Sequence, residues 1–393
     1  MKIIGYNSSH ETAIAQFDTD THTIDFVYEE ERFRRVKQWH PKPGQTDLLC
    51  IIRKNIQTPD AMIACSFDRR EWSWHWKTDE IKYDKMLQRE ILQDITQSVH
   101  TVERTKEIQK KWSEYVVPVV QDTNDYTFVD SPMDDLYHGA VAEQLGLENY
   151  TYEIEHHMYH AECGYYMSPW REKENAIVLV QDGGGCKRYH DTYPNYQEME
   201  TIYLCQPEKA PTRQWGRMSD NRFMDNMGQD NFWEFQKNAV IETPIFETEI
   251  DGVPTVFSSQ PSMGQNFSSL SLYFGFDKLG RAAGKVMGAA SYHEFDQTAD
   301  LGDFTMHSLG NFLQQKSYEY TVKLIQKAVD LNPDVPNIIL SGGYALNCTN
   351  NAKYLEAFPN HQFFVDPIAH DGGTAVGGAI RLARALKKGE TTV

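Results

Sequence analysis

The sequence predicts an α/β protein made of two similar halves, because the same order of apolar strands, turns and helices occurs twice. Each half opens with an apolar segment, a turn rich in Gly, Asn or Ser, and further short apolar segments, which is typical of strands. The strand-like segments are residues 3–5, 13–17 and 24–28 in the first half and residues 176–180, 188–193 and 201–204 in the second.

Each half then continues with a helix, a strand and another helix. These segments are residues 134–145, 150–154 and a helix starting at 156 in the first half, and residues 344–357, 363–365 and 374–387 in the second, after a short strand at 338–340. Such a duplication describes the ribonuclease-H-like fold of the sugar-kinase and actin superfamily, with a ligand in the interdomain cleft. We expect halves at residues 1–168 and 169–393, with packing of the last helix back on the first half as an alternative.

Two segments interrupt this pattern and are interpreted as insertions. Residues 69–128 are polar and aromatic, and residues 207–267 contain few periodic runs. Both carry tryptophans, which favours peripheral helices with small cores of their own. A lid over an acceptor site is the alternative, since functional loops commonly lie on a rigid scaffold.

Composition favours a cytoplasmic globular protein. Of the 393 residues, 40% are hydrophobic and 24% are charged, as is usual for a globular protein. The sequence contains no apolar run long enough to predict a membrane span. The six cysteines are scattered and are interpreted as reduced thiols, and the N-terminal residues show no signal-peptide pattern. The net charge of −18 argues against an extended nucleic-acid footprint, but it is compatible with a local pocket for a nucleotide.

His156 and His160 are predicted to bind one metal ion. They lie four residues apart, so a helix places both on one face. Asp371, at the start of the last helix, is the best candidate for a third ligand, and capping that helix is its alternative role. Imidazole with carboxylate suits Fe²⁺, Zn²⁺ or Mn²⁺. A packed, hydrogen-bonded histidine pair is the other interpretation.

Glycine turns at the ends of strands predict a phosphate or nucleotide site, because backbone N–H groups in such turns attract anions. Asn347 is expected to reach a ribose or base, or else to be a surface helix residue. The cofactor-binding candidates in the turns are Asp182, Gly183, Gly184, Ser341, Gly342 and Gly343, and Gly372 and Gly373 form a third turn. A metal-binding pair of histidines together with several phosphate-binding turns indicates an enzyme that acts on a nucleotide-activated group.

One histidine and one charged run near the N-terminus are candidates for contact with the substrates. His10 lies in the first turn, where it can serve as general base on an acceptor hydroxyl. The charged run from Glu29 to Lys37 can present Arg32, Arg35 and Lys37 to an anionic substrate. A solvated turn and a solvated strand end are the respective alternatives.

Six motifs occur in order along the chain: Gly5-x-Asn7-x-x-His10, Glu30-Glu31-Arg32-Phe33-x-Arg35-x-Lys37, His156-His157-x-x-His160-Ala161, Gly284-Lys285-Val286-Met287-Gly288, Ser341-Gly342-Gly343-x-Ala345-x-Asn347-Cys348 and Asp371-Gly372-Gly373-Thr374-Ala375-x-Gly377. Together they resemble the O-carbamoyltransferase family, which includes the nodulation-factor and antibiotic-tailoring carbamoyltransferases. That family is related to the tRNA threonylcarbamoyl transferase and to the hydrogenase-maturation carbamoyltransferase.

The resemblance implies an actin-like carbamoyltransferase domain that holds iron through His156, His160 and Asp371. It also implies binding of carbamoyl-adenylate, made from carbamoyl phosphate and ATP, with the glycine turns around its phosphate and residues 341–347 near adenosine. Lys285 joins the cofactor-binding candidates through its motif, and Mg²⁺ is a further candidate ion. By the same resemblance, His10 and Lys37 match positions near the acceptor and the carbamoyl group.

The chain departs from the family at two points. Glu11 follows His10 where the family usually has Asp, and the chain stops at Val393, where relatives typically continue with a domain that makes carbamoyl-adenylate. A separate synthetase is therefore one expected partner, and the alternatives are that this sequence is a piece of a longer chain or that the protein uses another carbamoyl donor directly. The expected acceptor is a hydroxyl of a small molecule, a sugar or a hydroxymethyl nucleotide, free or in DNA. The alternatives are a threonylcarbamoyl transferase for tRNA and a non-catalytic subunit that binds nucleotide and metal.

Overall fold

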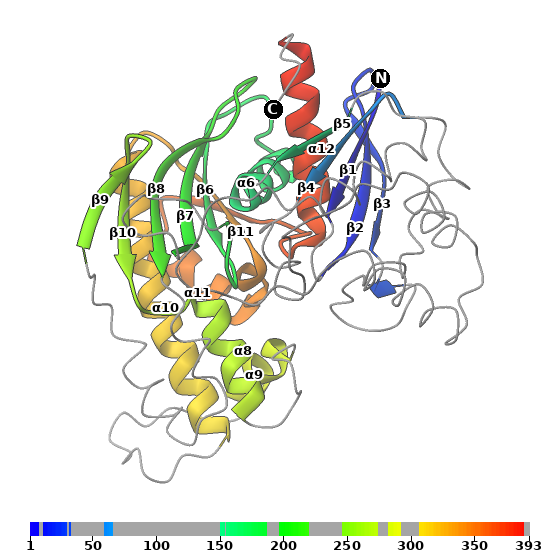
Figure 1. The fold of residues 1–393 in the computed structure, drawn as a ribbon. Helices are drawn as coiled ribbons and strands as arrows, with labels where there is room; N and C mark the ends of the chain where they lie inside the picture. The colour runs from blue at the N-terminus through cyan, green and yellow to red at the C-terminus, as the bar shows by residue number, and fades with distance from the viewer. Residues whose placement is uncertain are drawn as a thin grey trace, which may run out of the picture. The chain divides into compact units, whose positions relative to one another are not determined.

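A computed structural model describes residues 1–7, 11–29, 31–32, 59–65, 150–153, 155–186, 196–219, 246–273, 282–291 and 306–388 (Figure 1). The chain forms two compact units, one of Met1–Tyr159 with Asp371–Val393 and one of His160–His370. The boundary falls inside helix α6 (His156–Met167), whose first turn belongs to the first unit. Each unit has a sheet of its own.

The first unit contains a five-stranded sheet in the order β3-β2-β1-β4-β5. β1 is antiparallel to β2, and β2 to β3, whereas β4 is parallel to both β1 and β5. Helix α12 (Gly372–Lys387), near the end of the chain, packs against β1, β2 and β4 (Figure 1). The strands are β1 (Lys2–Asn7), β2 (Ala13–Asp18), β3 (Thr23–Glu29), β4 (Ala61–Cys65) and β5 (Tyr150–Glu153).

Two glycines allow α12 to approach its neighbours closely. A Cβ atom at Gly5 of β1 would collide with the carbonyl oxygen of Ala375, and one at Gly377 would collide with that of Tyr159. Because any side chain at either position would push main chains apart, these glycines fix α12 directly against β1 and the start of α6. The beginning of α12, with Asp371, is thereby held close to the first turn of α6.

The second unit contains a seven-stranded sheet in the order β12-β11-β6-β7-β8-β10-β9. β6 and β7 are antiparallel, as are β7 and β8, whereas β6, β11 and β12 run parallel. β10 is parallel to β8 and antiparallel to β9. The strands are β6 (Ala176–Gln181), β7 (Gln197–Cys205), β8 (Thr212–Ser219), β9 (Phe246–Ile250), β10 (Val253–Ser258), β11 (Asn337–Ser341) and β12 (Gln362–Val365).

The two sheets repeat one topology. When β9 and β10 are left out of the numbering, the order 3-2-1-4-5 describes β3-β2-β1-β4-β5 in the first unit and β8-β7-β6-β11-β12 in the second. The parallel and antiparallel pairings also agree strand by strand. This confirms the predicted fold class, a duplicated α/β fold of the ribonuclease-H-like, actin and sugar-kinase type. β10 and β9 extend the second sheet beyond the repeated part.

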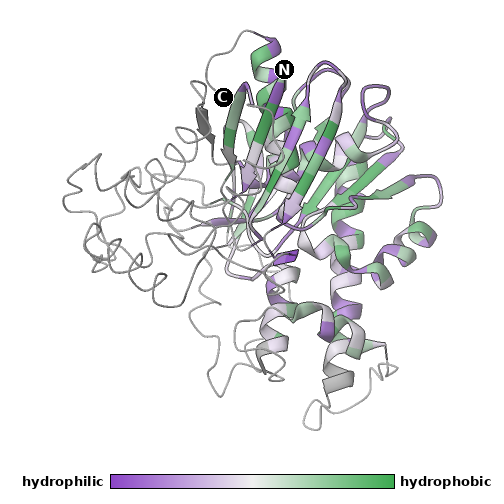
Figure 2. Ribbon diagram, turned by 90° about the vertical axis from the view of Figure 1, so that its right-hand side faces the viewer, coloured by the Kyte–Doolittle hydropathy of each residue, from purple (hydrophilic) through white to green (hydrophobic). Residues whose placement is uncertain are grey.

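Helices cover the apolar side chains of the second sheet. The long helix α10 (Met306–Leu331) buries Leu313, Tyr320, Leu324 and Ala328, which recur at the spacing of one helix face. They join apolar residues of β6 and β11 in one core, and the strands are accordingly rich in hydrophobic residues (Figure 2). The other helices are α8 (Met263–Tyr273), α9 (Ala283–Ala290), the 3₁₀ turn η4 (Gly343–Leu346) and α11 (Cys348–Ala357).

The structure differs from the sequence-based expectation in two segments. Residues 207–267, expected as an irregular insertion, contribute β8, β9 and β10 to the second sheet. Buried positions of these strands hold polar residues such as Arg217, Ser219 and Thr255, so the hydrophobic signal in the sequence is weak. The single helix expected at 344–357 is η4 followed by α11, because Asn347 ends the first and caps the second. The strand expected at 188–193, the helix expected at 134–145 and the insertion at 69–128 lie outside the described residues. Within the described part of the chain, no helix is long and apolar enough to cross a bilayer.

Candidate metal centre

Helix α6 presents two buried histidines on one face. His156 is its first residue and His160 follows one turn later, and their side chains are 1% and 0% exposed. A spacing of four residues on an α-helix brings two side chains to the same side. His157 is also buried but is rotated by about 100° around the helix axis. The helix thus offers a pair of imidazoles, as the sequence predicts.

Asp371 faces the first of these histidines. Its Oδ1 lies 3.4 Å from Nε2 of His156. Asp371 is the residue before helix α12, but its side chain makes no hydrogen bond that caps the helix. Capping, the alternative role considered for Asp371, is therefore not what its carboxylate does in this structure.

Asp182 faces the second histidine. It follows strand β6, and its Oδ2 lies 3.9 Å from Nε2 of His160. Its other oxygen, Oδ1, accepts a hydrogen bond of 2.9 Å from the backbone N–H of Gly343. The turn after β6 and the turn after β11 are therefore joined through this carboxylate, as expected where parallel neighbouring strands end at the same edge of a sheet.

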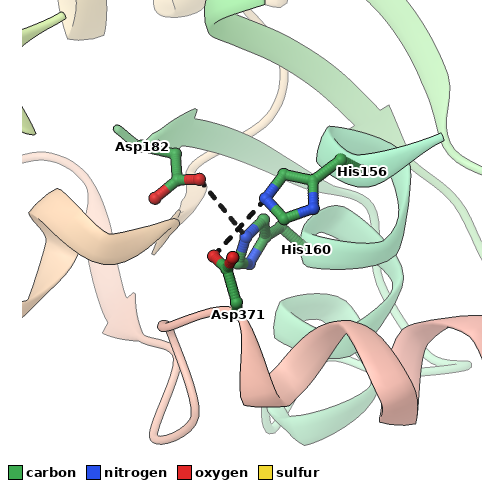
Figure 3. Close-up of side chains that lie close together, drawn as sticks. All are labelled: His156, His160, Asp182 and Asp371. Atoms are coloured by element: carbon green, nitrogen blue, oxygen red, sulfur yellow. Dashed lines mark ion pairs between the residues drawn. The ribbon is translucent and has the colours of Figure 1, made fainter. Parts of the chain in front are cut away.

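The four side chains form one group (Figure 3). One ligand atom from each of His156, His160, Asp182 and Asp371 lies within 4.8 Å of the others, and all four residues are buried. Two atoms bound about 2.1 Å from one ion lie about 3.4 Å apart at the tetrahedral angle and at most about 4.2 Å apart. The group therefore fits a transition-metal ion after a movement of less than about 1 Å. Its two imidazoles and two carboxylates suit Fe²⁺, Zn²⁺ or Mn²⁺.

Asp182 is the member of this group that sequence reasoning did not place at the metal. We expected it at the phosphate, because it precedes Gly183 and Gly184 in a glycine turn. The signal that could have found it is positional: a carboxylate directly after a buried central strand, in a protein that already offers two histidines.

The Ser341 side chain contacts helix α6. Its hydroxyl donates to Oδ2 of Asp366 at 2.8 Å and lies 3.3 Å from the carbonyl oxygen of His160. Asp366 also accepts hydrogen bonds from the Cys163 thiol and the Ile368 N–H. Burial raises the pKa of the Asp366 carboxyl above its usual range, and burial likewise raises the pKa of the Cys163 thiol. In this structure Ser341 contacts protein groups rather than offering its side chain to a ligand.

Asn347 is also committed to internal contacts. Its side chain caps α11 by accepting a hydrogen bond from the Asn350 N–H, and it exchanges two hydrogen bonds with the Gln314 amide of α10. It is only 2% exposed. Asn347 is therefore not the surface residue of the alternative expectation. Its amide is held by these internal hydrogen bonds, and its expected role at a ribose or base stays a prediction.

The remaining cofactor candidates are backbone turns and one lysine. Gly342 has a φ of 85°, and a Cβ atom there would collide with the Gln181 carbonyl oxygen, so only glycine suits this turn. The Gly183 carbonyl accepts a hydrogen bond of 2.9 Å from Ser262, and Gly184 packs against the side chain of Gln197. Lys285 is an exposed residue of α9. His10 and Lys37, the candidate catalytic residues, lie outside the described part of the chain.

The fold and the site together describe a duplicated actin-like protein with a candidate metal centre of histidines and aspartates. The sequence profile described as carbamoyltransferase N-terminus matches residues 2–332 of the chain. The chain therefore belongs to the carbamoyltransferase family. No curated protein matches it.

Several solved structures are similar in fold. They include HypF in its phosphate- and nucleotide-bound form (15% identity, TM-score 0.41, 75% of this chain and 51% of that one). HypF from T. kodakarensis is 12% identical, with a TM-score of 0.45, over 98% of this chain and 48% of that one. The ROK hexokinase from Thermus thermophilus is 10% identical, with a TM-score of 0.43, over 99% and 100% of the two chains. The chain thus spans about half the length of both HypF proteins.

Proposed function

We propose that this protein is an O-carbamoyltransferase that moves a carbamoyl group from carbamoyl-adenylate to a hydroxyl of an acceptor. Membership in the carbamoyltransferase family supports carbamoyl transfer in general. The observation that carries the finer proposal is the buried group of His156, His160, Asp182 and Asp371, because it offers a metal site within a domain of that family. We propose a small molecule, a sugar or a hydroxymethyl nucleotide as the acceptor class.

We propose Fe²⁺ as the ion that these four residues hold, with two imidazole and two carboxylate ligands. Such an ion, when bound, polarises a carbonyl oxygen as a Lewis acid, and this would favour attack on the carbamoyl carbon. Burial of all four side chains supports the proposal, since a buried carboxylate needs a compensating positive charge or hydrogen bonds. The net charge of the four side chains with neutral imidazoles is −2, which a divalent cation would neutralise.

The residues around the centre have proposed roles in binding the nucleotide. Backbone N–H groups at the start of α12, at Gly372 and Gly373, would attract the phosphate of carbamoyl-adenylate through the helix dipole. The turn at Gly183 and Gly184 would contribute further backbone groups. We assign this role to main-chain groups and not to the side chains of Ser341 and Asn347, because those side chains already hold hydrogen bonds inside the protein.

The proposed transfer step uses His10 and Lys37. The acceptor oxygen forms a bond to the carbamoyl carbon, the bond from that carbon to the phosphate oxygen breaks, and AMP leaves. His10 takes the proton of the acceptor hydroxyl, and Lys37 stabilises the negative charge that develops near the carbamoyl group. Alignment of the two reactants supplies a further part of the rate.

The test supplies the purified protein with synthetic carbamoyl-adenylate, Fe²⁺ and a panel of sugars, nucleosides and hydroxymethyl nucleotides, and measures AMP release and carbamoylated product by mass spectrometry. We expect transfer to one acceptor class, loss of transfer after chelation, and loss in His156→Ala. His157→Ala is the matched control, because His157 lies on the same helix outside the group of four. Absence of transfer from metal-loaded protein to every acceptor, together with no binding of adenine nucleotide, would contradict the proposal.

A further inference from the structure

The main chain of Asp371 is held from the β1–β2 region of the first unit. The Glu11 carboxylate accepts a hydrogen bond of 2.8 Å from the Asp371 N–H. The side-chain amide of Asn7, at the end of β1, donates to the Asp371 carbonyl at 2.9 Å and to the Glu11 carbonyl at 3.2 Å. Asn7 therefore ties the segment that carries Glu11 to the segment that carries Asp371.

The start of α12 would ordinarily be a place for a carboxylate. The first N–H groups of a helix have no partner inside the helix, and the helix dipole favours a negative charge beside them. Asp is one of the preferred residues for accepting these N–H groups. Asp371 occupies this position, yet its side chain makes no capping hydrogen bond and instead lies 3.4 Å from His156.

Glu11 supplies the negative charge that Asp371 does not direct to the helix. Its carboxylate accepts from the N–H that lies immediately before the helix, where charge and hydrogen bonding both stabilise the helix start. This negative charge lessens the electrostatic gain that the Asp371 carboxylate would have from turning back to the helix start, although the N–H that Glu11 accepts differs from the one that a capping side chain would accept. The orientation of the Asp371 carboxylate toward His156 is then the favoured one.

We infer that Glu11 is a positioning residue, which holds the start of α12 so that the Asp371 carboxylate points to the metal centre. The inference rests on the proposed metal site, because it assigns a purpose to the orientation of Asp371. A purely structural contact would join α12 to β1 and β2 without any effect on metal affinity. The two cases therefore differ in what a metal titration measures.

The first experiment titrates Zn²⁺ and Co²⁺ into the full chain and its Glu11 variants, with the Co²⁺ absorption spectrum as a readout of ligand geometry. Glu11→Ala should weaken binding by about tenfold or more, as is common when a group that orients a metal ligand is lost. Glu11→Gln keeps an acceptor and should weaken it by no more than about fivefold, since only the charge at the helix dipole is lost. Asp20→Ala, at an exposed ion pair of the same unit, is the matched control and should bind like the wild type. Unchanged affinity and spectrum in Glu11→Ala would overturn the inference.

The second experiment needs no metal. Melting temperatures are measured for the metal-free wild type, Glu11→Ala, Asp371→Ala and the double variant. If either carboxylate can serve the start of α12 when the other is missing, the double variant loses more than the sum of the two single losses. Additive losses would show that the two groups do not compete for that place. A wild type that binds no metal in the titration but shows this coupling would overturn the proposed metal site and leave the coupling of Glu11 to Asp371 standing.

Discussion

The two units share one strand order, but each holds an aspartate beside a histidine in a different way. In the first unit, Asp371 comes from the beginning of the last helix and is held through its main chain by Asn7 and Glu11. In the second unit, Asp182 directly follows the first strand, and its side chain holds the Gly343 N–H while it faces His160. Asp371 is thus held in place by its neighbours, whereas the Asp182 side chain itself holds a neighbouring turn in place. Replacing them should therefore have different consequences.

The units also differ in where they put their charges. In the first, Lys2 pairs with Asp18 and Asp25 at the edge of the surface, where Lys2 and Asp25 are partly exposed and Asp18 is nearly covered. In the second, the buried Arg217 makes a bidentate pair with Glu200 and further hydrogen bonds to Ser258 and to the carbonyls of residues 260 and 261. Burial alone would lower the pKa of Arg217, but the adjacent Glu200 carboxylate raises it above its ordinary value. A surface pair contributes little to stability, whereas breaking a buried pair leaves an uncompensated charge.

The largest expected effect is on metal binding. His156→Ala and Asp371→Ala should each lower metal affinity by more than about a hundredfold, since each removes a ligand and not only an orienting group. Metal content after dialysis, and titration with Zn²⁺, measure this. His157→Ala should retain most of the metal, because this residue points to another side of α6. Equal losses in all three variants would indicate a different ligand set.

Two variants of Asp182 distinguish its role as a metal ligand from its role as the hydrogen-bond acceptor for the Gly343 N–H. Asp182→Asn keeps an oxygen for the Gly343 N–H and removes the charge, so it should lose metal affinity while its melting temperature stays near that of the wild type. Asp182→Ala should lose both, with a loss of stability of about 1–3 kcal/mol from the unsatisfied Gly343 N–H. Urea unfolding of the metal-free proteins distinguishes them. Equal stabilities in the two variants would show that the contact to Gly343 does not matter.

The buried pair of the second unit should contribute more than any surface pair of the first. Glu200→Gln leaves the Arg217 guanidinium buried without its counter-charge, and we expect a loss of about 3–5 kcal/mol in the free energy of unfolding. Chemical denaturation measures it, and Tyr320→Phe, which removes one hydrogen bond to Glu200, is a milder companion variant with a loss of about 1 kcal/mol. A loss in Glu200→Gln no larger than that in Tyr320→Phe would be inconsistent with this account.

Replacing glycine by alanine should lower the free energy of unfolding at a crowded position and raise it at an open helical position. Gly377→Ala should destabilise by about 1–3 kcal/mol or more, because its Cβ would collide with the Tyr159 carbonyl and push α12 away from α6. Gly288→Ala is the matched control, since this residue lies in α9 with open space around it and an alanine there favours the helix. It should stabilise by about 0.4–1 kcal/mol. Unfolding curves that move in the same direction for both variants would contradict this contrast.

The smallest effect concerns the surface pair of the first unit. A hydrogen bond from Lys2 lowers the pKa of Asp18 to about 2 from its ordinary value of 3.8. Because the folded pKa is the lower one, this contribution to stability is complete above pH 3.8 and is lost as the pH falls toward 2. The difference in melting temperature between wild type and Asp18→Asn should therefore be small at pH 6 and vanish near pH 2. A melting-temperature difference between the two proteins that grows as the pH falls would contradict this prediction.

The sequence by itself determined the features that depend on near neighbours. Alternation of apolar segments and turns specified a duplicated α/β fold, and the strand order confirms it. The spacing of His156 and His160 specified that both share one helix face, since helical periodicity relates residues four positions apart regardless of the rest of the fold. The segment from Asp371 to Gly373 indicated the start of the last helix in the same local way.

Only the tertiary structure decided which distant groups meet. Asp182 lies beside His160 because β6 and β11 are parallel neighbours whose ends carry the two turns, and no local pattern states that pairing. Asn347 and Ser341 are buried by α10 and α6, so their polar atoms hold hydrogen bonds that a sequence motif does not show. Strands β8, β9 and β10 were missed for a different reason, because several of their buried positions hold polar residues such as Arg217, Ser219 and Thr255, so burial does not appear as an alternation of apolar residues. Periodicity is a property of one segment, whereas register and burial arise between segments that the chain brings together only on folding.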